Sequence, residues 1–380
     1  MSINNYLKSI ISVGLVSLIL GAVMLYDDNK SPNKKIQDGH NRTVSKEGSG
    51  TDNLKSNLVN EFVNKNNTNE ERVAELRSKA KDMYRSTFKQ GHMKKIRQYN
   101  YEDEWCVASE DLKENDFYYF QDEIKSWLFS RGHVTPQNKG ETQYFSLNSE
   151  FIKPYQELDV ETLIQHSRND DQMALITLVG RPGVDANTKL KAARRLVILG
   201  DTSTGLERLI MNELNQSGYQ KENVEKSKHH LTNALAYVEY GLMRYDTSGL
   251  ETYLMYASDK DTFLNGLDPA ELINSNDYDG ISRKARNLVD KINEQRLSRT
   301  LSELDMDNVP KAARMYYQHM LANHAYGQYE SLMNENWIPT TWKQDYLIKT
   351  PCVLRMIARN KFLNEQLAEI NKEISKLQGE

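Results

Sequence analysis

Cysteine and histidine, the residues that most often hold metals or act as nucleophiles and bases, are few in this chain. It has two cysteines and eight histidines, and none of them follows the His-Glu-x-x-His or Cys-x-x-Cys spacing that binds zinc. The adjacent His229 and His230 point to different sides of a helix. The sequence therefore predicts no metal site and no cofactor.

The two cysteines, Cys106 and Cys352, leave two interpretations open. In an oxidising compartment they would form one disulfide that ties an N-terminal subdomain to a C-terminal helix and stabilises the fold. Otherwise they would pack as two free thiols, which behave as small apolar side chains.

Three stretches resemble parts of known motifs but lack the groups that would complete them. Residues 180–183 (GRPG) lack the lysine of a phosphate-binding loop. Residues 275–280 begin like a calcium-binding loop, but Arg286 stands where a bidentate glutamate is required, so we expect an Asx-rich turn there. The acidic residues 102–104 give no sign of two carboxylates placed across a cleft. No catalytic residue is predicted.

Aromatic side chains are the remaining candidates for a binding surface. Tyr237, Tyr240, Tyr253 and Tyr256 would either line a groove for a partner, because tyrosine is favoured at interfaces, or pack between helices. Residues 96–153 form a second aromatic-rich part of the chain, which packs around its own small core or holds a pocket.

Composition limits the classes of function. The chain has 380 residues, with 49 Lys and Arg against 53 Asp and Glu, so its formal net charge is -4. Without a basic excess to neutralise phosphates, a nucleic-acid partner is not expected. The 27% charged and 38% hydrophobic residues are typical of a globular protein.

The N-terminus carries a membrane signal. Residues 9–26 have no charged side chain and would span about 27 Å as a helix, close to the thickness of a bilayer core. They form either an uncleaved anchor or a cleaved signal peptide. Because large domains that follow such a segment are usually exported, we expect a periplasmic or other extracytoplasmic location.

The rest of the chain divides into four parts. Residues 27–67 are polar and form a flexible linker. An N-terminal helical subdomain follows over 68–153, a helical-repeat domain over 154–345, and a C-terminal helix in 346–380. This last helix either caps the repeats or forms a homodimer through residues 351–378, because it carries an apolar seam.

An internal echo supports the repeat. Residues 169–175, 200–206 and 245–251 each place an aspartate before an apolar helix, where its carboxylate caps the free amides of the first turn. The phrase Lys-Ala-Ala-Arg occurs at 191–194 and again at 311–314. Its small residues would let two helices approach closely.

A family resemblance rests on residues 173–178 (MALITL), followed by Lys191-Ala192-Ala193 and Leu199-Gly200-Asp201. They resemble the phrasing of Sel-like repeats, relatives of the tetratricopeptide repeat. The similarity covers residues 155–215 well and 230–335 loosely. The resemblance implies a scaffold that binds proteins or peptides along a concave face, and it implies no catalytic residues.

Together these patterns predict an all-α protein, an α-solenoid of short antiparallel hairpins that follows the membrane segment and linker. We expect a membrane-tethered scaffold that binds a protein or peptide and performs no catalysis. Two alternatives remain: an enzyme acting on cell-envelope material with its site in residues 96–153, and a structural dimer.

Overall fold

The computed structural model describes residues 69–80, 82, 114–133, 151–349 and 351–378. Every regular element in these segments is helical, which confirms the predicted all-α class. The chain divides into two compact units, residues 98–361 and residues 1–97 with 362–380. The predicted membrane segment lies outside the described residues, and among the described helices none is long and apolar enough to cross a bilayer.

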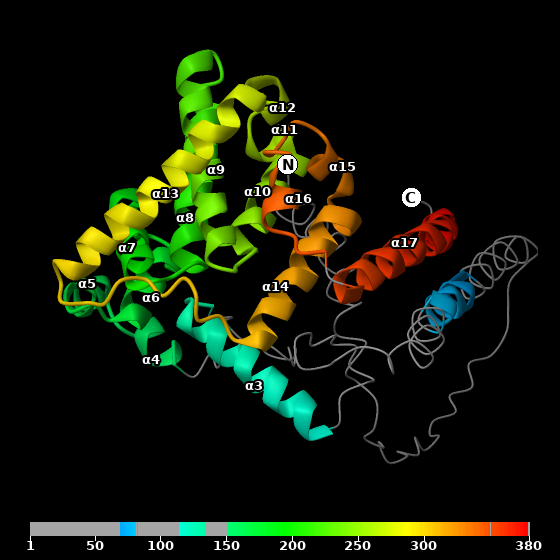
Figure 1. Ribbon diagram of the computed structural model, residues 1–380, viewed down its shortest axis with the longest axis horizontal. Coiled ribbons are helices and arrows are strands. Elements are labelled where there is room, and N and C mark those ends of the chain that lie inside the picture. The colour runs from blue at the N-terminus through cyan, green and yellow to red at the C-terminus, as the bar shows by residue number, and fades with distance from the viewer. Residues whose placement is uncertain (1–68, 81, 83–113, 134–150, 350, 379–380) are drawn as a thin grey trace, which may run out of the picture. The chain divides into compact units, whose positions relative to one another are not determined.

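From residue 114 onward, the helices are α3 (Glu114–Ser130), α4 (Lys153–Gln156), α5 (Val160–Arg168), α6 (Gln172–Gly180), α7 (Ala186–Leu199), α8 (Thr204–Tyr219), α9 (Val224–Met243), α10 (Ser248–Ser258), α11 (Lys260–Phe263), α12 (Pro269–Leu272), α13 (Ser275–Leu297), α14 (Lys311–Asn323), the π-helical segment η3 (His324–Gln328), α15 (Glu330–Asn334), α16 (Trp342–Asp345) and α17 (Pro351–Gln378). From α4 to α13 the helices follow one another with short connections, and a longer connection, residues 298–310, leads to α14 (Figure 1). From α5 to α10, each helix packs on the next one in the chain.

In the smaller unit, the helix over residues 69–80 pairs with the end of α17. Asn69 Nδ2 donates a hydrogen bond to the Leu377 carbonyl at 3.3 Å. One turn further on, Arg72 forms an ion pair of 3.2 Å with Glu373. The contacts advance along one helix as they recede along the other, so the helices are antiparallel. The end of α17 therefore has a helical partner within the same chain.

The predicted helix starts are confirmed in the larger unit. Asp171 accepts hydrogen bonds from the amides of the first turn of α6, at 3.1 and 3.2 Å. Asp201 does the same before α8, and Asp246 accepts from the Ser248 amide before α10 at 2.9 Å. The equivalent positions are thus Asp171 and Asp201, whereas the predicted alignment had paired Asp170 with Asp201.

The residue before each capping aspartate has a positive φ angle. The values are 63° at Asp170, 107° at Gly200 and 57° at Tyr245. A left-handed residue ends one helix, and the aspartate after it begins the next. The three hairpins α5/α6, α7/α8 and α9/α10 therefore turn through the same type of corner, although the residue in the left-handed position differs each time.

Small residues bring α7 and α8 together, as the Lys-Ala-Ala-Arg phrase predicts. Ala192 and Ala193 are buried on α7. A Cβ atom added to Gly205 of α8 would lie 2.8 Å from the Ala193 carbonyl oxygen and 2.7 Å from the Leu196 Cβ. Only a glycine fits at this crossing.

Helix α13 lies across α9 and α7 (Figure 1). It buries Tyr278, Ile281, Ala285 and Ile292 along one stripe, as an amphipathic helix does. Its first turn corrects one prediction, since residues 275–280 are helical and do not form an Asx-rich turn. Asn274, just before this turn, and Asp277 within it build a capping box at the start of the helix.

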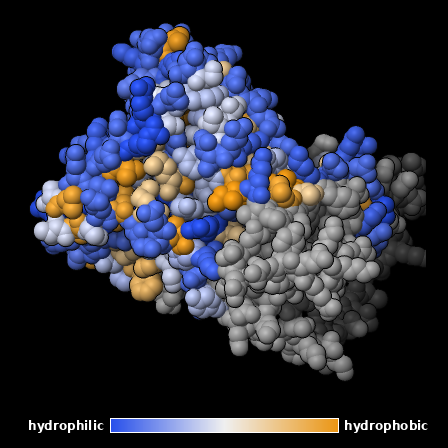
Figure 2. Space-filling model, viewed as in Figure 1, coloured by the Kyte–Doolittle hydropathy of each residue, from blue (hydrophilic) through white to orange (hydrophobic). Residues whose placement is uncertain are grey.

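The surface agrees with the polar composition. On the face shown in Figure 2, hydrophilic side chains cover most of the described surface, and hydrophobic side chains appear in separate patches. Most buried apolar side chains gather instead in one core that extends through α5–α10 and on to α17, and a smaller cluster joins α3 to α14.

Candidate functional site

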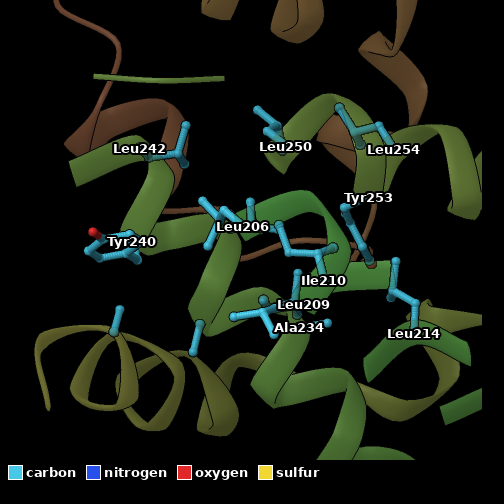
Figure 3. Close-up of a cluster of buried hydrophobic side chains, with 14 of the residues drawn as sticks. Leu206, Leu209, Ile210, Leu214, Ala234, Tyr240, Leu242, Leu250, Tyr253 and Leu254 are labelled. Atoms are coloured by element: carbon cyan, nitrogen blue, oxygen red, sulfur yellow. The ribbon is translucent and has the colours of Figure 1, made fainter. Parts of the chain in front are cut away.

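Three of the four predicted groove tyrosines lie in the core. Tyr240 and Tyr253 are fully buried among the leucines of α8 and α10 (Figure 3), and Tyr256 is 4% exposed. The Tyr253 hydroxyl donates to the Trp337 carbonyl, and Tyr256 stacks on Phe263 with ring centroids 4.7 Å apart. Tyr237 is the only one of the four whose side chain is half-buried.

Several other predictions fall outside the described residues. These are Cys106, the acidic residues 102–104, the linker at 27–67 and much of the aromatic-rich part of 96–153. Cys352 lies in α17, but its side chain is likewise outside the described part. The disulfide therefore stays a prediction.

A polar cluster that the sequence did not predict joins α3 to two of the hairpin corners. His133 Nε2 lies 2.6 Å from Asp246 Oδ2, at the corner between α9 and α10. The Thr202 hydroxyl donates to the same carboxylate oxygen at 2.5 Å. The Thr202 amide also donates to the Arg131 carbonyl at 3.0 Å. We call His133, Thr202, Asp246 and Asp201 the corner cluster.

Asp201 is the most deeply buried acid of the corner cluster. Its Oδ1 accepts from the amides of Ser203 and Gly205, at 3.1 and 2.8 Å. Its Oδ2 has no hydrogen-bond partner and packs against Gly132, where an added Cβ would lie 1.8 Å away. Because Gly132 also has a φ of +81°, both space and conformation require glycine there.

Burial, together with repulsion between neighbouring carboxylates, raises the pKa values of two acids of the site to near neutral pH. Burial raises the pKa of Asp201 to about 7, although amide hydrogen bonds and His133 oppose the shift. Burial likewise raises the pKa of Glu207, on the first turn of α8, to about 7. Both carboxyl groups can therefore exchange protons near neutrality.

The pKa values of His133 and Asp246 shift away from each other, as those of an ion pair do. Burial by itself would lower the pKa of His133, but the Asp246 carboxylate outweighs it and the value rises to about 8. Burial would raise the pKa of Asp246, yet His133 and the hydrogen bonds from Thr202 and Ser248 hold it below its usual range. His133 is thus cationic and Asp246 anionic at neutral pH.

Two buried arginines, Arg131 just after α3 and Arg244 just after α9, lie close in sequence to His133 and Asp246 of the corner cluster. Arg131 is 9% exposed and its guanidinium lies 3.8 Å from the Trp127 ring centroid. Arg244 is 2% exposed and donates from Nη1 to the Tyr240 hydroxyl at 3.4 Å. Burial, followed by repulsion from Arg244, lowers the pKa of Arg131 to about 10. The two guanidinium groups are therefore close enough to repel each other.

The corner cluster contains groups that exchange protons near neutral pH. Within the described segments, no group of three or more His, Cys, Asp or Glu residues is placed to hold a metal ion. His133 is the accessible member, with 21% of its side chain exposed. The sequence showed Asp201 and Asp246 as helix starts, but it gave no signal that His133 would meet them, because the three lie far apart in the chain.

Comparison with known proteins identifies no relative. No protein-family model matches the chain, no curated protein matches it, and no solved structure matches it. The resemblance to Sel-like repeats therefore stays a prediction, and the described part of the chain is all-helical, with adjacent helices packed in sequence.

Proposed function

We propose that this protein is a membrane-tethered helical-repeat scaffold that binds a protein or peptide partner at the cell envelope, without catalysis. The uncharged residues 9–26 and the polar linker after them support the tether. The repeated corners of three consecutive hairpins support the repeat, because an α-solenoid is built by stacking such pairs.

One observation carries the binding part of this proposal: the hairpins already hold an amphipathic helix, α13, across α7 and α9. Polar contacts, in addition to the buried apolar stripe, hold α13 in position. Lys284 donates to Thr232 and Asn233 at 2.7 and 2.8 Å, and Ser282 donates to Glu239 at 2.8 Å. A surface that recognises one helix through such contacts is suited to recognise another.

Tyr237 on α9, the helix that α13 crosses, is half-buried. Burial raises the pKa of Tyr237, the Glu213 carboxylate raises it further, and the Arg194 guanidinium lowers it. The Glu213 carboxylate on α8 and the Arg194 guanidinium on α7 are therefore close enough to act on the Tyr237 hydroxyl. A half-buried tyrosine near an acid and a base is the kind of residue that anchors a protein interface.

Site-specific photo-cross-linking of the full-length protein in its native membrane tests the proposal. Benzoylphenylalanine replaces Tyr237 in one variant and Tyr219 in the matched control, since Tyr219 is 71% exposed at the far end of α8. We expect one cross-linked protein of constant mass from position 237 alone, lost when Arg194→Glu is added. Equal products at both positions, or self-links only, would contradict the proposal.

A second candidate function rests on the corner cluster. His133 belongs to residues 96–153, where the alternative enzyme site was expected, and it converges with Asp246, Asp201 and Glu207. A histidine beside carboxyl groups that titrate near neutrality can act as an acid or a base. Incubating purified cell-envelope polymers with the protein and with His133→Gln tests this candidate: products from the first alone would favour an enzyme.

A further inference from the structure

Among the residues that the structure describes, Arg131 and Arg244 are buried cations without an ionic partner. Neither guanidinium lies within 4.0 Å of a carboxylate in the described part of the chain. The Nε atoms of both are buried and have no hydrogen-bond acceptor. Arginine stays charged in proteins, and a buried charge without compensation is strongly destabilising. Each arginine therefore keeps a buried Nε–H donor that an anion would satisfy.

The connections around them place both arginines at one junction. The Arg131 carbonyl accepts from Thr202, and the Thr202 hydroxyl donates to Asp246, two residues after Arg244. Repulsion from Arg244 contributes to the lowered pKa of Arg131, and it also contributes to the lowered pKa of Arg296 on α13, after burial. The Arg244 guanidinium is therefore close enough to repel both of the others: Arg131 follows α3, Arg244 follows α9, and Arg296 lies on α13.

The neighbouring acids are engaged elsewhere. Asp246 receives His133 and Thr202 on Oδ2 and Ser248 on Oδ1. Asp305, in the connection after α13, is exposed and accepts from the amides of Asp307 and Asn308. Neither carboxylate reaches salt-bridge distance of the two arginines.

Arg296 shows what a satisfied arginine looks like at the same junction. Its Nε donates to the Ser302 carbonyl at 2.7 Å and its Nη1 donates to the Ile198 carbonyl at 2.8 Å. Arg244 makes only one long hydrogen bond, to the Tyr240 hydroxyl. Since that hydroxyl accepts there, its own proton is available to another acceptor.

We propose that Arg131, Arg244 and the Tyr240 hydroxyl form a binding site for a compact tetrahedral oxyanion, namely free phosphate. Two planar guanidinium groups and a hydroxyl supply the donors that such an ion accepts. The burial of Arg244 favours the free ion over an organic phosphate ester, because a larger group would have to displace core side chains. This inference is independent of the proposed scaffold function.

Thermal unfolding of the full-length protein in detergent micelles tests the site. We expect inorganic phosphate to raise the melting temperature in a saturable way, by several degrees, above a chloride control of equal ionic strength. Sulfate should act similarly, and glycerol phosphate should have no effect. An equal response to glycerol phosphate would overturn the assignment to the free ion, and a phosphate response no larger than that to chloride would overturn the site.

Two variants make this test specific. Arg244→Met should abolish the phosphate response while leaving the protein at least as stable without phosphate, because it removes a buried charge. Tyr240→Phe deletes only a hydroxyl, so it keeps the fold and should weaken phosphate binding several-fold in calorimetric titration. Arg283→Met, on the exposed face of α13, is the matched control. An undiminished response in both Arg244→Met and Tyr240→Phe would refute the site.

Discussion

His133 Nε2 lies 2.6 Å from Asp246 Oδ2, and this contact joins the end of α3 to the corner between α9 and α10. More than one hundred residues of chain separate the two side chains. The corner already used Asp246 to begin a helix, so a single carboxylate caps α10 and anchors α3. The stability of this junction and its dependence on pH both follow from that double use.

Removing one partner of this ion pair should destabilise the larger unit. We expect His133→Gln to lower the free energy of unfolding by about 3 kcal/mol, because it leaves Asp246 buried without its counter-ion. Urea unfolding followed by circular dichroism measures the change. Lys125→Gln, which breaks an exposed pair with Asp122, is the control and should cost less than about 1 kcal/mol.

The stability of the fold should decline as pH rises through neutrality. Folding raises the pKa of Asp201 from 3.8 to about 7 and that of Glu207 from 4.5 to about 7. Between these values the folded state binds more protons than the unfolded state, so the free energy of unfolding decreases with pH. His133 extends the decline, since its pKa rises from 6.5 to about 8.

Urea midpoints at a series of pH values check this dependence. The midpoint should be higher near pH 5 than near pH 8, and Glu207→Gln should flatten the slope between pH 5 and 7. Below pH 4 the trend should reverse, because Asp246 has a lowered pKa and loses its stabilising charge there. Glu222→Gln changes an exposed acid and should leave the slope as it is. A urea midpoint that does not change from pH 5 to 8 would refute the raised pKa values of Asp201 and Glu207.

Gly132→Ala should be strongly destabilising. The new Cβ would overlap Asp201 Oδ2 at 1.8 Å, and the φ of +81° is unfavourable for alanine. We expect a loss of about 3 kcal/mol from strain and steric overlap. Gly280→Ala offers the opposite case, since nothing lies within 4 Å of its added Cβ and alanine favours the interior of α13, by up to about 1 kcal/mol. Denaturant unfolding of the two variants should therefore move in opposite directions.

Helix α13 should behave as part of the folded core. Ile281 of this helix is fully buried, so Ile281→Ala should lower the free energy of unfolding by about 3 kcal/mol. Leu297→Ala, at the 55% exposed end of the same helix, should change it by less than about 1 kcal/mol. If both substitutions had the same small effect, α13 would not be held on α7 and α9 as described.

The sequence by itself determined the local structure of this protein. Helix periodicity, the capping aspartates and the Lys-Ala-Ala-Arg phrase are short-range signals, because capping and small-residue packing act within a few residues of the chain. They predicted the all-α class, the helix starts before α6, α8 and α10, and the close approach of α7 and α8. Residues 275–280 were the exception. They were expected to form a turn, but they begin the long helix α13, which Asn274 and Asp277 cap.

Only the tertiary structure decided which distant residues meet. Nothing in the spacing of His133, Asp201 and Asp246 predicts a shared cluster, and the burial of Tyr240 and Tyr253 cannot be distinguished from a groove by tyrosine content. Burial and convergence depend on how whole helices pack, which is a property of the complete chain. The raised and lowered pKa values arise from that packing, since desolvation and charge proximity exist only once the helices have come together.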